Sequence, residues 1–241
     1  MPTPVESDSR AAYDAWHAAL GVDASADTPW HRIIRSYLSI PSLEQSCILE
    51  IGCGRGDFSC WLAQQVRSPR QLIAADFSAT AVNKGREFAM SRGLQLDWQV
   101  MDIQNIALAD SSVDVIVSCE TIEHVTDPRL ALRELARVLR PGGRLFLTTP
   151  NYMNPMGLYR GYLRLRGRRF QETGQPINNF VMLPRTLAWV RAAGLRISTF
   201  ESRGMYLPYP GRPPIDAKWL DHPRWITRWL GLHSFVMATK T

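Results

Sequence analysis

The sequence of 241 residues lacks the features of several special classes of protein. No apolar run comes near the roughly 18 residues that a membrane-spanning helix needs, and no signal peptide is recognisable, so we expect a cytoplasmic protein. The four cysteines, Cys47, Cys53, Cys60 and Cys119, show no paired zinc-binding spacing, and we interpret them as reduced core residues. Internal repeats and low-complexity tracts are also missing. We therefore expect one large globular domain.

Acidic residues are scarce in the last part of the chain. Residues 151–241 carry 14 Lys and Arg but only 4 Asp and Glu, a net charge of +10, whereas residues 1–150 have a net charge of −4. The same segment holds Trp219, Trp225 and Trp229. Basic and aromatic side chains together suit an anionic lipid surface, RNA or an anionic substrate. A solvated cationic surface over an aromatic core, with 159–169 as a solvated basic helix, fits the same pattern.

A glycine-rich turn follows a short apolar strand near residue 50. The run Ile48–Gly56 has an acidic residue, Glu50, and then glycines at alternate positions, Gly52, Gly54 and Gly56. Glycine lets a backbone turn sharply and lets a ligand approach closely. About 20 residues further on, a second apolar strand ends in Asp76, where a carboxylate can hold ribose hydroxyls. The glycine turn and Asp76 together predict a site for a ligand that contains adenosine. This ligand need not carry a pyrophosphate.

Apolar strands alternate with amphipathic helices through most of the chain, which predicts an α/β fold with a parallel sheet and helices on both faces. Thr28, Ser78 and Asp127 stand at expected helix starts. We expect strands at 46–51, 71–75, 95–100, 113–118, 144–149, 195–200 and 232–239, and helices at 9–20, 29–40, 57–66, 78–91, 127–139 and 184–193.

Over residues 46–150, with weaker matches to the C-terminus, the chain resembles the class I S-adenosylmethionine-dependent methyltransferases. The glycine turn, Asp76, the stretch 100–102 and the Arg-Pro-Gly-Gly at 140–143 occur in that family's order. The resemblance implies a Rossmann-like, seven-stranded, mostly parallel sheet whose last strand is antiparallel and inserted between strands five and six. A doubly wound domain that binds another nucleotide is the alternative.

The resemblance also implies how a single domain, 1–241, is divided. Residues 1–45 would form lid helices over the cofactor, and 46–150 the cofactor-binding core. Two insertions, 150–183 and 204–230, would reach the carboxyl edge of the sheet and bind the acceptor.

The same resemblance gives roles to residues around S-adenosylmethionine. Glu50 would help to hold the amino group of the methionine part, and Asp76 the ribose. Phe77 would pack on the adenine, and Asp102 would accept from the adenine amino group. Plain alternatives stay open, since Asp102 fits a turn residue and Asp76 a helix cap. The expected cofactor-binding residues are Glu50, Gly52, Gly54, Gly56, Asp76, Phe77, Asp102, Ile103 and Cys119.

A second cluster of chemical groups, Cys119–Val125, follows the fourth expected strand. If this loop turns helically, Glu120 and Glu123 share one face beside His124. Two carboxylates and an imidazole suit Mg²⁺ or Mn²⁺, which would lower the pKa of a bound hydroxyl. Without a metal, His124 is a base or merely hydrogen-bonded, and Glu120 lines the pocket. We expect Glu120, Glu123 and His124 to be catalytic in either case.

The Glu-x-x-Glu-His pattern is similar to that of the quinone-biosynthesis O-methyltransferases and of the small-RNA 3′-end 2′-O-methyltransferases. The RNA enzymes supply a further histidine after the fifth strand, but residues 175–180 contain none. His17, His31, His222 and His233 are scattered, and we interpret each as structural or solvent-exposed.

These observations predict a methyltransferase that acts on a hydroxyl of a small aromatic or lipophilic acceptor, such as a catechol, a quinone precursor or a secondary metabolite. RNA 2′-O-methylation, sugar or polyketide O-methylation and a non-catalytic cofactor-binding regulator are the alternatives. A small-molecule acceptor is the expected partner, with peripheral contact to an anionic membrane as a further hypothesis. Nucleic acid is not an expected partner.

Overall fold

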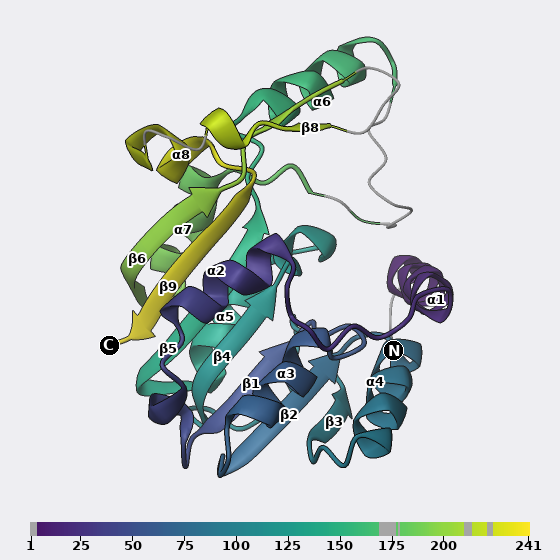
Figure 1. The fold of residues 1–241 in the computed structure, drawn as a ribbon, viewed down its shortest axis with the longest axis vertical. Coiled ribbons are helices and arrows are strands. Elements are labelled where there is room, and N and C mark those ends of the chain that lie inside the picture. Colours follow the sequence, from purple (N-terminus) through teal and green to yellow (C-terminus); the bar gives the residue numbers. More distant parts are fainter. Residues whose placement is uncertain (1–3, 169–176, 178, 210–213, 221–223) are drawn as a thin grey trace.

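A computed structural model describes residues 4–168, 177, 179–209, 214–220 and 224–241. Within them, seven strands form one sheet in the order β3-β2-β1-β4-β5-β9-β6 (Figure 1). Neighbouring strands from β3 to β5 run parallel, and β9 is antiparallel to both β5 and β6. The predicted fold class is confirmed, including the insertion of the antiparallel last strand. The strands are β1 (Cys47–Ile51), β2 (Gln71–Asp76), β3 (Asp97–Val100), β4 (Val113–Cys119), β5 (Leu139–Pro150), β6 (Leu195–Arg203) and β9 (His233–Lys240), and a small hairpin pairs β7 (Tyr206–Leu207) with β8 (Ile215–Asp216).

Helices begin where the sequence offers a capping side chain. Thr28, Ser78 and Asp127 each accept a hydrogen bond from an amide in the first turn of the following helix, which satisfies a donor that would otherwise be unpaired. The α-helices are α1 (Pro4–Ala18), α2 (Pro29–Tyr37), α3 (Asp57–Gln65), α4 (Ala79–Ser91), α5 (Pro128–Val138), α6 (Pro155–Leu165), α7 (Leu183–Ala192) and α8 (Arg224–Leu230). Short 3₁₀ helices are η1 (Ile40–Leu43), η2 (Ile122–His124) and η3 (Lys218–Leu220).

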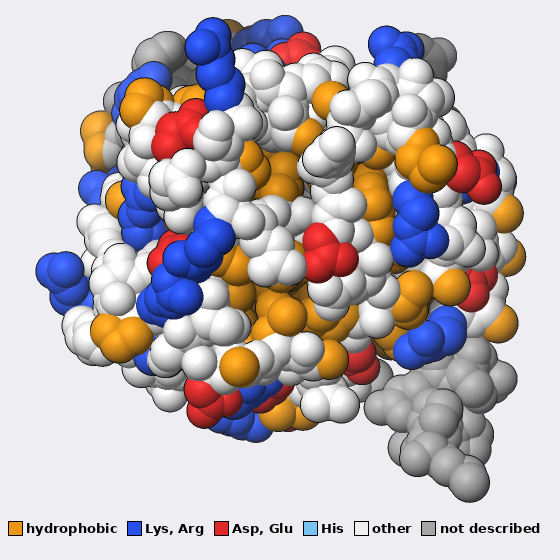
Figure 2. Space-filling model, turned by 90° about the horizontal axis from the view of Figure 1, so that it is seen from below, with side chains coloured by type: hydrophobic (Ala, Val, Ile, Leu, Met, Phe, Trp, Pro, Cys, Tyr) orange, Lys and Arg blue, Asp and Glu red, His pale blue; other side chains and the backbone are white. Residues whose placement is uncertain are grey.

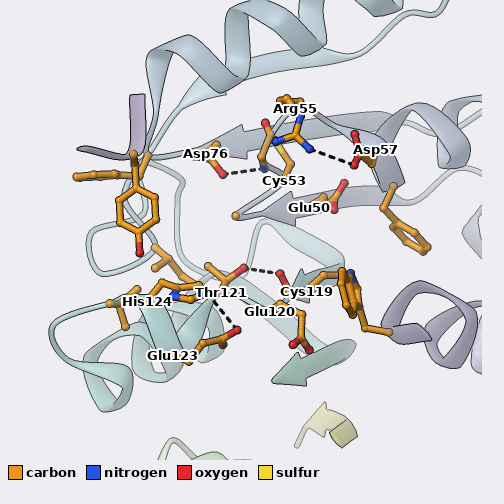
Figure 3. A pocket seen from close by; sticks show the side chains of 18 of the residues that line it. Glu50, Cys53, Arg55, Asp57, Asp76, Cys119, Glu120, Thr121, Glu123 and His124 are labelled. Atoms are coloured by element: carbon orange, nitrogen blue, oxygen red, sulfur yellow. Dashed lines mark hydrogen bonds and ion pairs between the residues drawn. The ribbon is translucent and has the colours of Figure 1, made fainter. Parts of the chain in front are cut away.

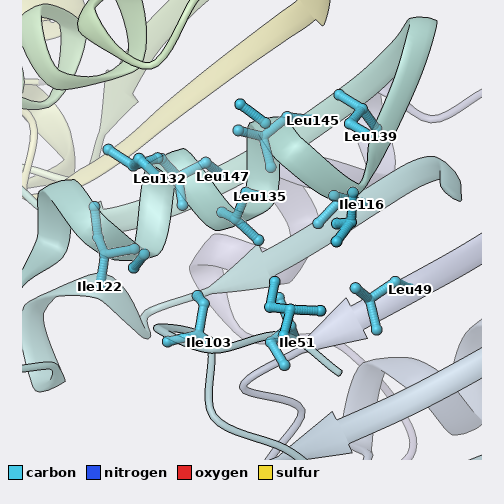
Figure 4. Packing of buried hydrophobic residues seen from close by; sticks show 14 of the residues in the cluster. Leu49, Ile51, Ile103, Ile116, Ile122, Leu132, Leu135, Leu139, Leu145 and Leu147 are labelled. Carbon is cyan, nitrogen blue, oxygen red and sulfur yellow. The ribbon is translucent and has the colours of Figure 1, made fainter. Parts of the chain in front are cut away.

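The core lies on both faces of the sheet because its central strands are buried on both sides. In β1, Leu49 and Ile51 pack against one face with residues of α5 and α7, whereas Ile48 packs against the other with residues of α2 and α3. Figure 4 shows the first layer, in which α5 lies over β4 and β5. The layer includes Leu132, Leu135, Ile116, Leu145 and Leu147, all of them fully buried.

Two boundaries differ from the sequence expectation for clear reasons. Strand β5 begins at Leu139 rather than at 144, because Leu139 already pairs with Val113 of β4 across a register shift. Helix α2 ends at Tyr37 instead of 40, and its last turn leads into η1, which has Pro41 in its first turn. Proline has no amide hydrogen and therefore cannot continue an α-helical ladder.

The C-terminal part of helix α1 is fixed to α4. Near the start of α4, the carboxylate of Asp14 accepts hydrogen bonds from the Ser78 hydroxyl and from the Thr80 amide. At the end of α1, the ammonium of Lys84 donates to three carbonyl oxygens, those of His17, Ala18 and Leu20. A cation suits the carbonyls at a helix C-terminus. These bonds hold α1 over the carboxyl edge of the sheet, where a lid is expected (Figure 1).

The segments expected as insertions gather at one end of the molecule, where Figure 1 shows α6, β8 and α8 together. Several large apolar side chains there are exposed: Leu158 by 79%, Leu165 by 89%, Trp219 by 71% and Trp225 by 74%. The opposite end, seen in Figure 2, carries Lys or Arg side chains interspersed with Asp and Glu. No helix among the described residues is long and apolar enough to cross a membrane.

Candidate functional site

The glycine turn between β1 and α3 is held by hydrogen bonds and by close contacts with the rest of the protein. The amides of Gly52 and Cys53 donate to the carbonyl of Ala75 at the end of β2. Gly52 (φ +75°) and Gly56 (φ +77°) adopt left-handed conformations that favour glycine. A Cβ would lie 2.2 Å from Thr121 at Gly52 and 2.2 Å from Trp98 at Gly56. Glycine is therefore required at both positions by packing within the protein, in addition to any close approach of a ligand.

Asp76 closes this turn. Its carboxylate accepts hydrogen bonds from the amides of Gly54 (2.7 Å) and Ser78 (2.8 Å). Burial raises the pKa of Asp76, and those two hydrogen bonds oppose the shift. A carboxylate has about four lone-pair sites, so it can still accept from a ligand hydroxyl. Asp76 lines the cavity above the turn, which is compatible with the expected ribose contact.

Glu50 is a buried carboxylic acid in the wall of the cavity. It is 2% exposed, and it accepts a hydrogen bond from the Ser59 hydroxyl. Burial raises its pKa to about 8, and the nearby carboxylates of Asp57 and Asp76 add to that effect. A ligand ammonium placed beside Glu50 would favour the ionised form, which fits the expected contact with an amino group.

The residues expected around the adenine line the same cavity, which includes Phe77, Asp102, Ile103 and Cys119. The guanidinium of Arg10 lies 4.2 Å from the centre of the Phe77 ring. Asp102 also closes a local turn, because its carboxylate accepts from the amide of Gln104 at 2.8 Å. Asp102 can therefore stabilise this turn and still accept a hydrogen bond from a ligand.

The cavity has a volume of about 480 Å³. It is lined by residues at the ends of β1 and β2 and by residues that follow β4. Figure 3 shows Asp76, Arg55 and Glu50 on one side of it and Glu120, Glu123 and His124 on the other. Parallel strands β1, β2 and β4 all end here, which explains why residues far apart in the sequence converge.

The loop after β4 is not the continuous helical turn that the metal hypothesis assumed. Glu120 has a left-handed backbone (φ +46°), Thr121 is also non-helical, and η2 covers only Ile122–His124. The condition on which Glu120 and Glu123 would share a helical face is therefore not met. A non-glycine residue in this conformation is strained, and such strain is concentrated at functional sites.

His124 is oriented by its two neighbours. Its Nδ1 lies 2.7 Å from the carbonyl oxygen of Ile177, and its Nε2 lies 3.5 Å from Glu123 Oε1. A carbonyl can only accept, so a neutral His124 carries its proton on Nδ1 and has a lone pair on Nε2. Glu123, 1% exposed, also accepts from the Thr149 hydroxyl at 3.0 Å. The carbonyl of Ile177 thus holds Nδ1, and the carboxylate of Glu123 lies beside Nε2, the nitrogen that would act as a base.

Metal ligation does not fit these side chains. Among the residues that the structure describes, no three His, Cys, Asp or Glu side chains are grouped so that they could hold a metal ion. Glu120, Glu123 and His124, the expected ligands of Mg²⁺ or Mn²⁺, are all described and form no such group.

Several cavity residues were missed by the sequence analysis. Helix α1 contributes Tyr13, Trp16 and His17, which recur at the three- and four-residue spacing of one helical face. Burial raises the pKa of the Tyr13 hydroxyl, which donates to the Ile177 carbonyl at 3.4 Å. Arg55, inside the glycine turn, contacts Nδ1 of His17 at 3.1 Å. The resemblance placed residues 1–45 over the cofactor as lid helices, but it did not single out these side chains.

Three of the scattered histidines belong to this site. His17, His31 and His233 line the cavity, and burial lowers the pKa of each to about 4. The interpretation of these three as merely structural or exposed is therefore incomplete. His222 lies outside the described residues.

The two expected acceptor-binding insertions contribute little to the described walls. Pro150 and Ile177 line the cavity from 150–183, and no described residue of 204–230 does so. Half of the segment 175–180, where a further histidine was sought, lies outside the described residues.

Comparisons with known proteins agree with this geometry. Residues 49–147 match a family described as a methyltransferase domain. A ubiquinone biosynthesis O-methyltransferase from Xanthomonas axonopodis pv. citri is 28% identical over 174 residues, which are 71% of each chain. A SAM-dependent methyltransferase from Aquifex aeolicus has a similar structure, with a TM-score of 0.59 and 17% identity over 88% of this chain and 90% of that one. The Haloferax volcanii complex between the Trm112 methyltransferase activator and a putative methyltransferase gives a TM-score of 0.63, at 19% identity over 95% and 96% of the chains.

Proposed function

Because the chain belongs to the class I S-adenosylmethionine-dependent methyltransferases, we propose that it methylates a hydroxyl of a small aromatic or lipophilic acceptor. When bound, S-adenosylmethionine supplies an electrophilic methyl group on a sulfonium. The hydroxyl as target is supported by an imidazole with a free nitrogen at the site, since a hydroxyl must lose its proton to become a strong nucleophile. The named relative, a ubiquinone biosynthesis O-methyltransferase, supports an oxygen acceptor.

The residues of the cavity fit the cofactor. The buried acid Glu50 would hold a ligand ammonium, and Asp76 would accept from ribose hydroxyls while it keeps its bond to Gly54. Phe77 and Ile103 would bound the adenine, with Asp102 beside its amino group. Gly52 and Gly54 line this part of the cavity without adding side chains to it, whereas Gly56 is not part of the described wall.

His124 would act as the general base. Its Nε2 would accept the proton of the acceptor hydroxyl as the oxygen bonds to the methyl carbon, and the bond from that carbon to the sulfonium sulfur would break to leave a neutral thioether. The imidazolium would then release its proton to solvent. The imidazolium formed in between would be stabilised by the Ile177 carbonyl on Nδ1 and by Glu123 near Nε2. The single observation that carries this role is the 2.7 Å contact between Nδ1 and Ile177, because it leaves Nε2 unprotonated. Glu120 would line the acceptor side of the cavity.

The insertions 150–183 and 204–230 would bind the rest of a lipophilic acceptor or the surface that holds it. The exposed side chains of α6 and of the segment around Trp219 and Trp225, beside the net charge of +10 in residues 151–241, support peripheral contact with an anionic membrane.

Turnover with a radiolabelled methyl donor and a panel of lipophilic phenols, catechols, sugars and short RNAs tests the proposal. We expect label in a phenol or catechol and none in RNA. Transfer only to RNA or a sugar would refute the acceptor class. Binding of the donor without transfer to any member of the panel would instead favour the non-catalytic regulator.

A further inference from the structure

The methionine part of S-adenosylmethionine carries a carboxylate as well as an ammonium group. Glu50 would hold the ammonium, but the residues expected around the cofactor include no cationic side chain, and three of them, Glu50, Asp76 and Asp102, are acids. A carboxylate that leaves water needs charged or hydrogen-bonding partners. Other residues of the cavity must therefore supply them.

His17 of α1 and Arg55 of the glycine turn lie where this carboxylate is expected. Both line the cavity, and Figure 3 shows Arg55 on the same side of it as Glu50. One edge of the His17 ring faces the glycine turn, because its Cε1 would lie 3.4 Å from a Cβ at Gly54. The carboxylate and the ammonium are attached to one carbon atom, so a ligand bound at Glu50 places its carboxylate close to this turn.

Arg55 determines which nitrogen of His17 carries the proton. Its Nη1 lies 3.1 Å from Nδ1 of His17, and a guanidinium can only donate, so Nδ1 accepts. Burial and the charge of Arg55 lower the pKa of His17 to about 4, so the ring is neutral near pH 7 and has its proton on Nε2. No described residue hydrogen-bonds to Nε2, and this atom is not one of the buried nitrogens that lack a partner. His17 therefore offers the cavity an accessible N–H donor.

The charge around this donor favours an anion. Arg55 and Lys84 both act on His17 as cations, whereas the carboxylate of Asp14 acts in the opposite sense. Arg55 is itself held by an ion pair with Asp57 at 3.7 Å, with side chains that are 14% and 24% exposed. A cation fixed behind a neutral donor polarises it, which strengthens the hydrogen bond that the donor makes to an anion.

We propose that His17 binds the carboxylate of the methionine part through its Nε2–H, with Arg55 fixing the tautomer, and so selects methyl donors that carry this carboxylate. This inference rests on the proposed function, whose donor molecule it concerns. Because His17 belongs to α1, the bound carboxylate would also tie this helix to the glycine turn. A ligand without the carboxylate would leave the N–H donor unpaired and bind more weakly.

Calorimetry with S-adenosylhomocysteine and with its decarboxylated analogue, which keeps the amino group, tests the proposal. We expect the wild type to prefer S-adenosylhomocysteine about ten- to hundredfold, the scale of a hydrogen bond to a charged group. His17→Phe should remove most of this preference and leave the affinity for the decarboxylated analogue unchanged. Arg32→Gln, which removes an exposed cation outside the cavity, is the control and should keep the preference.

Two further measurements cover a His17→Phe variant that folds poorly. His17→Gln, which keeps an N–H donor near the position of Nε2, should retain most of the preference. In the wild type, the ¹⁵N resonances of His17 should report a proton on Nε2, and the Nε2 resonance should shift more with S-adenosylhomocysteine than with the decarboxylated analogue. An undiminished preference in His17→Phe, a proton on Nδ1, or equal shifts with both ligands overturns the proposal. Retained methyl transfer to a phenol in that case would keep the proposed function, so the two failures are distinguishable.

Discussion

The carboxylate of Asp76 lies 2.7 Å from the amide nitrogen of Gly54, and this bond joins the end of β2 to the glycine turn after β1. One side chain thus shapes the turn and lines the cavity above it. A change at Asp76 should therefore affect both the ligand and the conformation of the turn.

Asp76→Ala should weaken the binding of S-adenosylmethionine by roughly 1–3 kcal/mol, the scale of losing hydrogen bonds to a charged group. Calorimetry with the cofactor and with S-adenosylhomocysteine measures the loss. Asp97→Ala, which removes a carboxylate on the neighbouring strand β3 outside the cavity, is the control and should bind normally. Wild-type affinity in Asp76→Ala would contradict the ribose role.

Glu50 should make the free energy of unfolding depend on pH. Its folded pKa of about 8 lies above the ordinary value of 4.5, so the folded protein binds more protons than the unfolded chain between these values. Stability should fall as pH rises from about 4.5 to 8, and the loss should be complete above 8. Urea unfolding of the wild type and of Glu50→Gln at several pH values isolates this contribution. Parallel pH profiles of the two proteins would show that Glu50 is ionised at its usual pKa.

His124→Ala should lower the rate of methyl transfer roughly 10²–10⁴-fold, the usual range for loss of a general base, with unchanged cofactor affinity. Single-turnover kinetics measure the chemical step, and calorimetry measures the affinity. Glu123→Gln should slow transfer less, because it removes only the charge beside the imidazolium. Wild-type rates in a Glu123→Ala, His124→Ala double variant would exclude the loop from the mechanism.

Activity should persist after exhaustive chelation, because Glu120, Glu123 and His124 are not grouped as metal ligands. Assays of chelator-treated and untreated protein, each with and without added Mg²⁺ or Mn²⁺, should agree. Loss of turnover that either ion restores would mean that the loop rearranges around a metal.

Vesicles with anionic lipid should sediment the protein at low salt, and the bound fraction should decline as salt increases. A Trp219→Ser, Trp225→Ser variant should bind more weakly, because both rings are exposed at the α6 and α8 end. Met90→Ser, an equally exposed apolar residue on α4, is the control. Absence of binding at low salt would assign the basic segment to an ordinary solvated surface.

The sequence predicted the fold well because its strands and helices carry clear periods and caps. Asp76 and Asp102 could be placed at the sheet edge, since the end of a parallel strand is a position that the sequence marks. Trp30 and His31 could not be placed there. Their role depends on how α2 packs against β9, a contact between segments about 200 residues apart.

Backbone conformation was the other feature that could not be predicted from the sequence. A loop with acidic residues three apart reads as a helical turn, and only the structure reveals the positive φ of Glu120. Likewise, the glycines were interpreted through a ligand, whereas the rings and hydroxyls of Trp98 and Thr121 already exclude a Cβ at two of them. Such contacts arise from tertiary packing, which local patterns do not encode.

The uneven charge has an effect before any contact is made. A net charge of +10 in residues 151–241 and −4 in residues 1–150 gives the chain an electric dipole, with the cationic α6 and α8 at one end of the molecule. In the field of an anionic surface the molecule would experience a torque that turns this end forward during its approach. The field decays over a Debye length of about 8 Å at physiological ionic strength, so this orientation would act only in the last steps of diffusion.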